Sequence, residues 1–115
     1  MKRPKKLFDK YAILPKVIKL GYQDITVTEV DAIDNTQGSY NNESHEIKIK
    51  AGQGSREQLN TLLHEILHAC IYSYGLKCEF KDDDTEEKIV NALGNGLTEA
   101  LVRNKDLVTF IGKSV

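Results

Sequence analysis

The chain lacks several features that would assign it to a large functional class. None of its apolar runs approaches the ~18 residues that a membrane-spanning helix needs. Its charges nearly cancel, at a net charge of −1, so bulk charge predicts neither a nucleic acid nor a membrane surface as partner. The basic N-terminus is not followed by the uninterrupted apolar segment of a secretory signal. These absences predict a cytoplasmic protein, and 115 residues predict a single domain with one modest core.

Cysteine and histidine are scarce. Cys70 and Cys78 are the only cysteines, and both are expected to stay reduced in a cytoplasmic protein. Cys70 falls on the apolar side of a predicted helix and is interpreted as a core residue, whereas Cys78 falls in the loop after that helix. The chain has three histidines, and two of them lie in one motif, at His64 and His68.

Residues 64–68 have the sequence HEILH, an HExxH motif within a strongly helical stretch. One helical turn separates His64 from His68, so both imidazoles project from one face and can bind a single metal ion. Glu65 lies beside the pair, where it can take a proton from a metal-bound water. The motif arises by chance in roughly 0.4% of shuffled chains of this composition. It predicts a zinc-dependent hydrolase, most often a peptidase, and the alternative is two exposed histidines on an ordinary amphipathic helix.

Short alternating segments precede the motif and predict strands at residues 17–20, 25–30, 39–40 and 45–50. Their short connections predict a small antiparallel β-meander of three or four strands. Ser55 and Gln58 form a potential capping box for a helix over residues 56–74, and Gly75 suits the position after its end.

A second helix is predicted from the acidic residues 82–84 to about residue 103. Asp83 and Glu86 form a potential second capping box, and Gly94 and Gly96 indicate close packing against a neighbour. Six apolar residues form its predicted core face: Ile89, Val90, Leu93, Leu97, Ala100 and Leu101. A short final segment at 107–111 is expected to cover the core. The predicted fold class is α+β, with residues 1–14 as a basic N-terminal arm and 15–115 as a single domain.

A catalytic zinc site usually has three protein ligands and a water, so a third ligand is needed. On the second helix Glu86 lies over the middle of the apolar arc, and Glu87 lies at its edge. His64 and His68 have the same edge position on their own helix. Two helices packed core to core bring these edges together, so Glu87 is favoured as the ligand. Glu86 is the alternative, and a helix-capping role for both carboxylates remains open.

Four other residues carry weaker hypotheses. Cys78 is ten residues past His68 and would complete a His/His/Cys site. His45 is either a surface residue or a hydrogen-bonding partner of a substrate. Tyr72, one turn beyond His68, is either a boundary tyrosine or a donor to a developing oxyanion, and Tyr40 has a similar standing.

The pattern resembles minimal gluzincins, and it is most similar to small phage and mobile-element proteins of the ImmA/IrrE-like metallopeptidase type. The HExxH motif is shared by many zincins, whereas the order and spacing of the later segments are more specific. The similar stretches lie between about residues 17 and 111: GSY at 38–40, IKI at 47–49, TLLHEILHA at 61–69, YGL at 74–76, EKIVNALGNGL at 87–97 and RNKDL at 103–107.

The resemblance implies a zincin-like domain in which His64, His68 and Glu87 bind Zn²⁺ and Glu65 is the general base. It also implies that the strand near residues 45–50 borders the cleft and that a peptide substrate lies antiparallel to it. A phage-derived protein of this kind would act in the cytoplasm of a bacterial host.

Two other functions compete with the metallopeptidase. The first is a catalytically inactive zinc-binding adaptor, a phage accessory protein that binds a protein partner. The second is a metal-dependent nuclease served by the basic arm, although nucleic acid is not the favoured partner. The sequence predicts no membrane partner, and it leaves the substrate and the oligomeric state open.

Overall fold

The computed structural model describes residues 13–33 and 35–115, so the predicted basic arm lies almost entirely outside the described residues. The fold is a small α+β domain, as predicted. Four strands come first, β1 (Val17–Leu20), β2 (Gln23–Val30), β3 (Gly38–Asn41) and β4 (Glu46–Lys50). They are followed by helix α2 (Ser55–Ser73), the short 3₁₀ helix η1 (Lys77–Glu79), and helices α3 (Asp83–Arg103) and α4 (Lys105–Ser114). Across the described residues, no helix combines the length and apolarity needed to cross a membrane.

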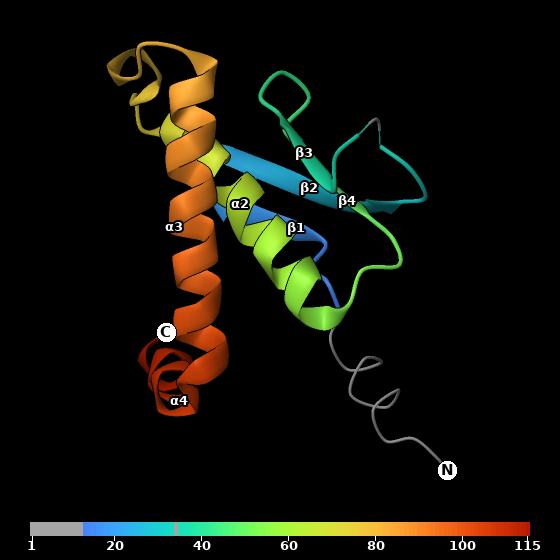
Figure 1. Ribbon diagram of the computed structural model, residues 1–115, viewed down its shortest axis with the longest axis vertical. Helices are drawn as coiled ribbons and strands as arrows, with labels where there is room; N and C mark the ends of the chain where they lie inside the picture. Colours follow the sequence, from blue (N-terminus) through green and yellow to red (C-terminus); the bar gives the residue numbers. More distant parts are fainter. Residues whose placement is uncertain (1–12, 34) are drawn as a thin grey trace.

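The four strands form a mixed sheet in the order β1-β2-β4-β3, so the predicted antiparallel meander is wrong. β2 and β4 run parallel, whereas β1–β2 and β3–β4 are antiparallel. The connection between β2 and β3 is long enough to carry the chain to the outer edge, and a tight turn then returns β4 between them (Figure 1). β4 suits the interior because Ile47 and Ile49 are both fully buried.

This strand order changes which strand borders the cleft. The strand at residues 45–50, expected at the cleft, is interior, and β3 is the edge strand instead.

The core lies between one face of the sheet and α2. Ile25 and Val27 alternate with exposed residues along β2, so they reach the same face as Ile47 and Ile49 of β4. These side chains pack against Leu62 and Ala69 of α2. Burial of each large aliphatic side chain contributes roughly 1.5–3 kcal/mol, so this small cluster supplies most of the hydrophobic stabilisation that holds α2 on the sheet.

The ends of α2 and α3 are defined by residues that differ in part from the prediction. Gly54 is the N-cap of α2, so the predicted Ser55–Gln58 capping box is wrong. Gly75 has φ +74° after the last turn of α2, as its predicted position requires. The N-cap of α3 is Asp82, whose side chain accepts a hydrogen bond from the Thr85 backbone N–H at 2.7 Å. The predicted capping box of Asp83 and Glu86 therefore does not form, and the Glu86 side chain makes other contacts.

α2 is sandwiched between the sheet and α3 (Figure 1). The close side of α3 carries Val90, Gly94 and Thr98, all buried. Three of the six residues in the apolar face predicted for α3 are exposed, namely Ile89, Leu93 and Leu97. α4 has no buried residue and lies across the far end of α3, so the expectation that the C-terminal segment covers the core is wrong.

Candidate metal centre

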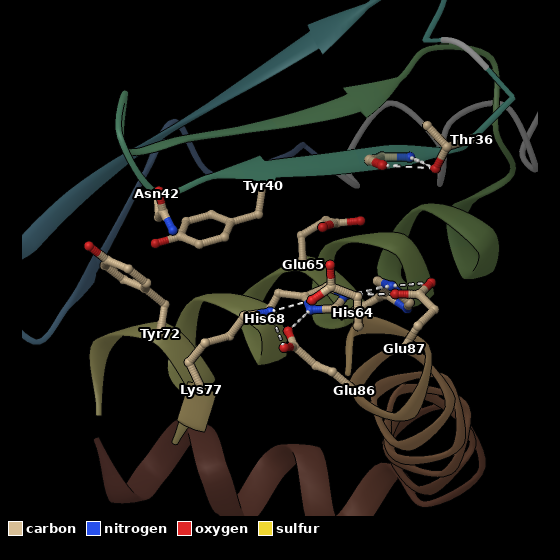
Figure 2. A pocket seen from close by; sticks show the side chains of 12 residues that line it. Thr36, Tyr40, Asn42, His64, Glu65, His68, Tyr72, Lys77, Glu86 and Glu87 are labelled. Carbon is tan, nitrogen blue, oxygen red and sulfur yellow. Dashed lines mark hydrogen bonds and ion pairs between the residues drawn. The ribbon is translucent and has the colours of Figure 1, made fainter. Parts of the chain in front are cut away.

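Three side chains from α2 and α3 converge at one point (Figure 2). The Nε2 atoms of His64 and His68 lie 3.2 Å apart. One carboxylate oxygen of Glu87 is 2.9 Å from Nε2 of His68, and the other is 3.2 Å from Nε2 of His64. The structure therefore brings together the two histidines and the glutamate that the sequence analysis favoured.

Local sequence explains this convergence. The two histidines are one turn apart on α2, and their ring centroids lie 4.8 Å from each other. α3 packs on this part of α2 at Gly94, where a Cβ would make an ordinary van der Waals contact of 3.7 Å with the Cα of His64. Glu87 is two turns before Gly94, so its side chain reaches the histidine pair along the same line of contact.

The arrangement fits a zinc ion in both chemistry and spacing. Two imidazole nitrogens and a carboxylate are a donor set that zinc binds in catalytic sites. Atoms bonded to tetrahedral zinc at ~2.0–2.1 Å are separated from each other by roughly 3.3 Å. The three distances of 3.2, 2.9 and 3.2 Å are close to that separation. Burial lowers the pKa of His64, with the Glu87 charge opposing it, which favours the neutral imidazole that a metal needs.

Glu86 supports the site from behind His68. Its Oε2 lies 2.6 Å from Nδ1 of His68, and its Oε1 accepts a hydrogen bond from Nζ of Lys77 at 2.6 Å. A proton held on Nδ1 by this carboxylate leaves Nε2 free to bind a metal. Burial opposes ionisation of Glu86, but its bonds to Lys77 and His68 prevail and lower its pKa. Glu86 therefore neither caps α3 nor occupies the position where the other three side chains meet.

Glu65 is buried beside the convergence point, with 5% of its surface exposed. Burial raises the pKa of its carboxyl to about 7, opposed by His68 and reinforced by Glu87. One of its oxygens lies within 4.8 Å of a nitrogen of each histidine, whereas the Glu87 oxygens are closer. Its carboxylate faces β3, since a Cβ at Gly38 would lie 3.3 Å from Oε2 of Glu65. This position suits a proton acceptor better than a metal ligand.

A cleft of about 380 Å³ opens over these residues, between β3 and the N-terminal part of α3. Tyr40 and Tyr72 stand at one end of it and Thr36 at the other (Figure 2). The Tyr40 hydroxyl donates to Oε1 of Gln23 at 2.9 Å, so its proton is already engaged. Tyr72 is 37% exposed and lines the cleft, and its interactions with Tyr22, a side-chain hydrogen bond among them, raise the pKa of its phenol.

Two of the weaker candidates lie elsewhere. Nδ1 of His45 is 2.7 Å from Oε1 of Gln23, and His45 is not among the described residues that line the cleft. Cys78 is exposed on η1 and is likewise absent from that lining.

Sequence reasoning missed three residues that shape the site: Gln23, Gly38 and Lys77. Gln23 is a buried amide that joins Tyr40, His45 and Ser73. No local pattern marked Gln23 or Lys77, because their partners are distant in the chain or on another element. The sequence analysis named Gly38 only as part of the GSY segment. The structure explains why a glycine stands there, because Glu65 approaches it closely.

Comparisons of the chain with protein-family models, with curated proteins and with solved structures found no match. The resemblance to gluzincins stays a prediction, and any assignment of function depends on the site itself.

Proposed function

We propose that this protein is a zinc-dependent metallopeptidase. The observation that carries the proposal is the convergence of His64, His68 and Glu87 at mutual distances of 3.2, 2.9 and 3.2 Å, with the buried Glu65 beside them. A purely structural zinc site has four protein ligands and no need of a base. Three ligands with an adjacent carboxylate favour a hydrolytic site.

His64, His68 and Glu87 would hold the zinc, and Glu86 would keep His68 in the required tautomer. When bound, zinc supplies a Lewis acid that acidifies a water molecule and polarises a carbonyl oxygen. Glu65 accepts a proton at its carboxylate and passes it to the leaving amine. Tyr72 also lines the cleft, but its hydroxyl group points away from the histidines (Figure 2), so we assign it no role in the proposed reaction.

The cleft also has a binding edge suited to an extended peptide. The Lys50 N–H donates to the Gln37 carbonyl, so the next hydrogen-bonded pair in the antiparallel ladder is Ser39 with Lys48. Gly38 and Tyr40 therefore direct their backbone groups away from β4. The Thr36 hydroxyl donates to the Gly38 carbonyl at 2.9 Å and accepts from the Gly38 N–H at 3.4 Å. An extended chain lying along β3 would therefore meet the backbone groups of Tyr40 and replace Thr36 at Gly38, while its carbonyl faced Glu65. This edge, β3, replaces the strand at 45–50 in the hypothesis drawn from the sequence.

Metal content and peptide hydrolysis of matched variants test the proposal. Wild type should hold about one zinc per chain, and Glu87→Ala should lose most of it because a ligand is gone. Glu65→Gln should keep the zinc and lose hydrolysis of a degenerate peptide library. Glu99→Ala is the matched control, since Glu99 is an exposed glutamate on the same helix.

Two results would contradict the proposal in different ways. Absence of zinc from wild type, even after incubation with the metal, would remove the hydrolase interpretation. Zinc binding without hydrolysis, unchanged between wild type and Glu65→Gln, would favour the zinc-binding adaptor.

A further inference from the structure

α3 and α4 carry a large apolar surface that nothing in the described chain covers. On α3 it consists of Ile89, Leu93 and Leu97, which are 41%, 52% and 44% exposed. On α4 it consists of Leu107, Val108, Phe110 and Ile111, which are 39% to 67% exposed. We call these seven side chains the α3–α4 surface. Surfaces of this kind on a small domain mark sites of association.

The part on α3 has the spacing of a helix-packing stripe. Ile89, Leu93 and Leu97 recur every four residues and so form one ridge along the helix. Gly96 lies next to this ridge, and a Cβ there would meet nothing within 4 Å. Glycine destabilises a helix interior relative to alanine. Gly94 faces α2, whereas Gly96 faces no other part of the described chain, and a second helix approaching this face would give Gly96 a contact.

α4 points to the same conclusion. It is a ten-residue amphipathic helix without a buried residue, and its main contact is with α3. Isolated helices shorter than ~12–15 residues are marginal in water, so α4 needs a partner for its apolar face. Figure 1 shows α4 lying across the C-terminal end of α3, so the two helices adjoin.

We propose that a second copy of this chain covers the α3–α4 surface in a two-fold symmetric dimer. The surface carries no charge, and the chain's net charge of −1 gives little self-repulsion. Ile89 and Leu97 lie four residues on either side of Leu93, so an antiparallel pair of α3 helices centred at Leu93 would set Ile89 against Leu97 of the partner subunit. The seven side chains expose on the order of 600 Å² per copy, and a pair would bury on the order of 1,200 Å², the lower end for specific interfaces.

Multi-angle light scattering after size exclusion tests the dimer, with the full chain loaded at high micromolar concentration. Wild type should have twice the monomer mass of 13.0 kDa. Leu93→Glu and Phe110→Glu, on different helices, should each shift the mass to that of the monomer. Ile13→Glu is the matched control, because Ile13 is 77% exposed outside this surface, and it should stay dimeric. Circular dichroism checks that each variant keeps its fold.

A second measurement does not depend on the variants. Amide hydrogen exchange of α4 in wild type should be slow at high concentration and at least tenfold faster after dilution to the monomer. A wild-type monomer at high concentration would overturn the proposal. So would assemblies larger than a dimer, or a dimer that survives both glutamate substitutions.

Discussion

Replacing Glu65 by glutamine should stabilise the metal-free protein above neutral pH. Burial raises the pKa of Glu65 from 4.5 to about 7 in the folded chain. Between those two pH values the unfolded chain releases the proton first, so the folded state binds more protons and its stability falls as pH rises. Below the unfolded pKa both states are protonated and the effect vanishes; above the folded pKa the destabilisation is complete.

The structure sets the magnitude. One pKa unit corresponds to ~1.4 kcal/mol, so the shift from 4.5 to about 7 corresponds to at most about 3 kcal/mol. A buried glutamine amide also loses hydration, which offsets part of this gain. We therefore expect Glu65→Gln to raise the free energy of unfolding by on the order of 1–3 kcal/mol at about pH 8, with the gain shrinking toward zero as pH falls to the unfolded pKa.

Urea denaturation in the presence of a chelator, followed by far-UV circular dichroism, measures this difference directly. Glu43→Gln is the control, because Glu43 is exposed in the turn between β3 and β4 and should change stability by no more than about 0.5 kcal/mol. All other ionisable groups are the same in both proteins, so their contributions largely cancel in the comparison. A glutamine variant no more stable than wild type at about pH 8, or equally stabilised at about pH 5, would refute the reasoning.

Three other substitutions test the contact of Glu86 with His68, the close packing at Gly38 and the core of the sheet. Glu86→Gln should weaken zinc binding by roughly 10–100-fold because His68 loses its anionic partner, and competition with a chromophoric chelator measures this; unchanged affinity would rule out that role. Gly38→Ala should cost about 1–3 kcal/mol, since its Cβ would lie 2.5 Å from Cγ2 of Thr61, whereas Gly112→Ala, with open space around it, should cost nothing in the same urea titration. Ile47→Ala should cost about 2–5 kcal/mol in that titration, and a smaller loss would mean that this fully buried side chain is not central to the core.

The secondary structure was largely predictable because local patterns produce it. Period-two alternation identified the strands, and the 3.6-residue period with Gly75 at its end identified α2. The order of strands in the sheet was not predictable in the same way. It depends on where the connection from β2 leads and on the burial of Ile47 and Ile49 at the centre of the sheet. Neither is visible in neighbouring residues.

The apolar face of α2 shows a second limit of prediction from the sequence. On a helical wheel, the apolar residues of α2 centre near Leu63, Cys70 and Tyr74. This centre averages two contacts, because α2 packs against the sheet on one side and α3 on the other. The side toward the sheet is centred on Leu62 and Ala69 instead. Tyr74 lies beyond both contacts and is 63% exposed. A helix that packs between two layers has two contact faces, so a helical wheel cannot identify a single buried centre.

By itself, the sequence determined the two histidines at one-turn spacing, the adjacent Glu65 and the acidic start of α3, because these depend only on helical periodicity. The tertiary structure decided the partners: Glu87 beside both histidines, Glu86 behind His68, and β3 along the cleft. It also decided that half of the predicted apolar face of α3, and the apolar side chains of α4, are not buried in the core. The physical reason is the same throughout, since distances between segments far apart in the chain are set by packing and not by local propensity.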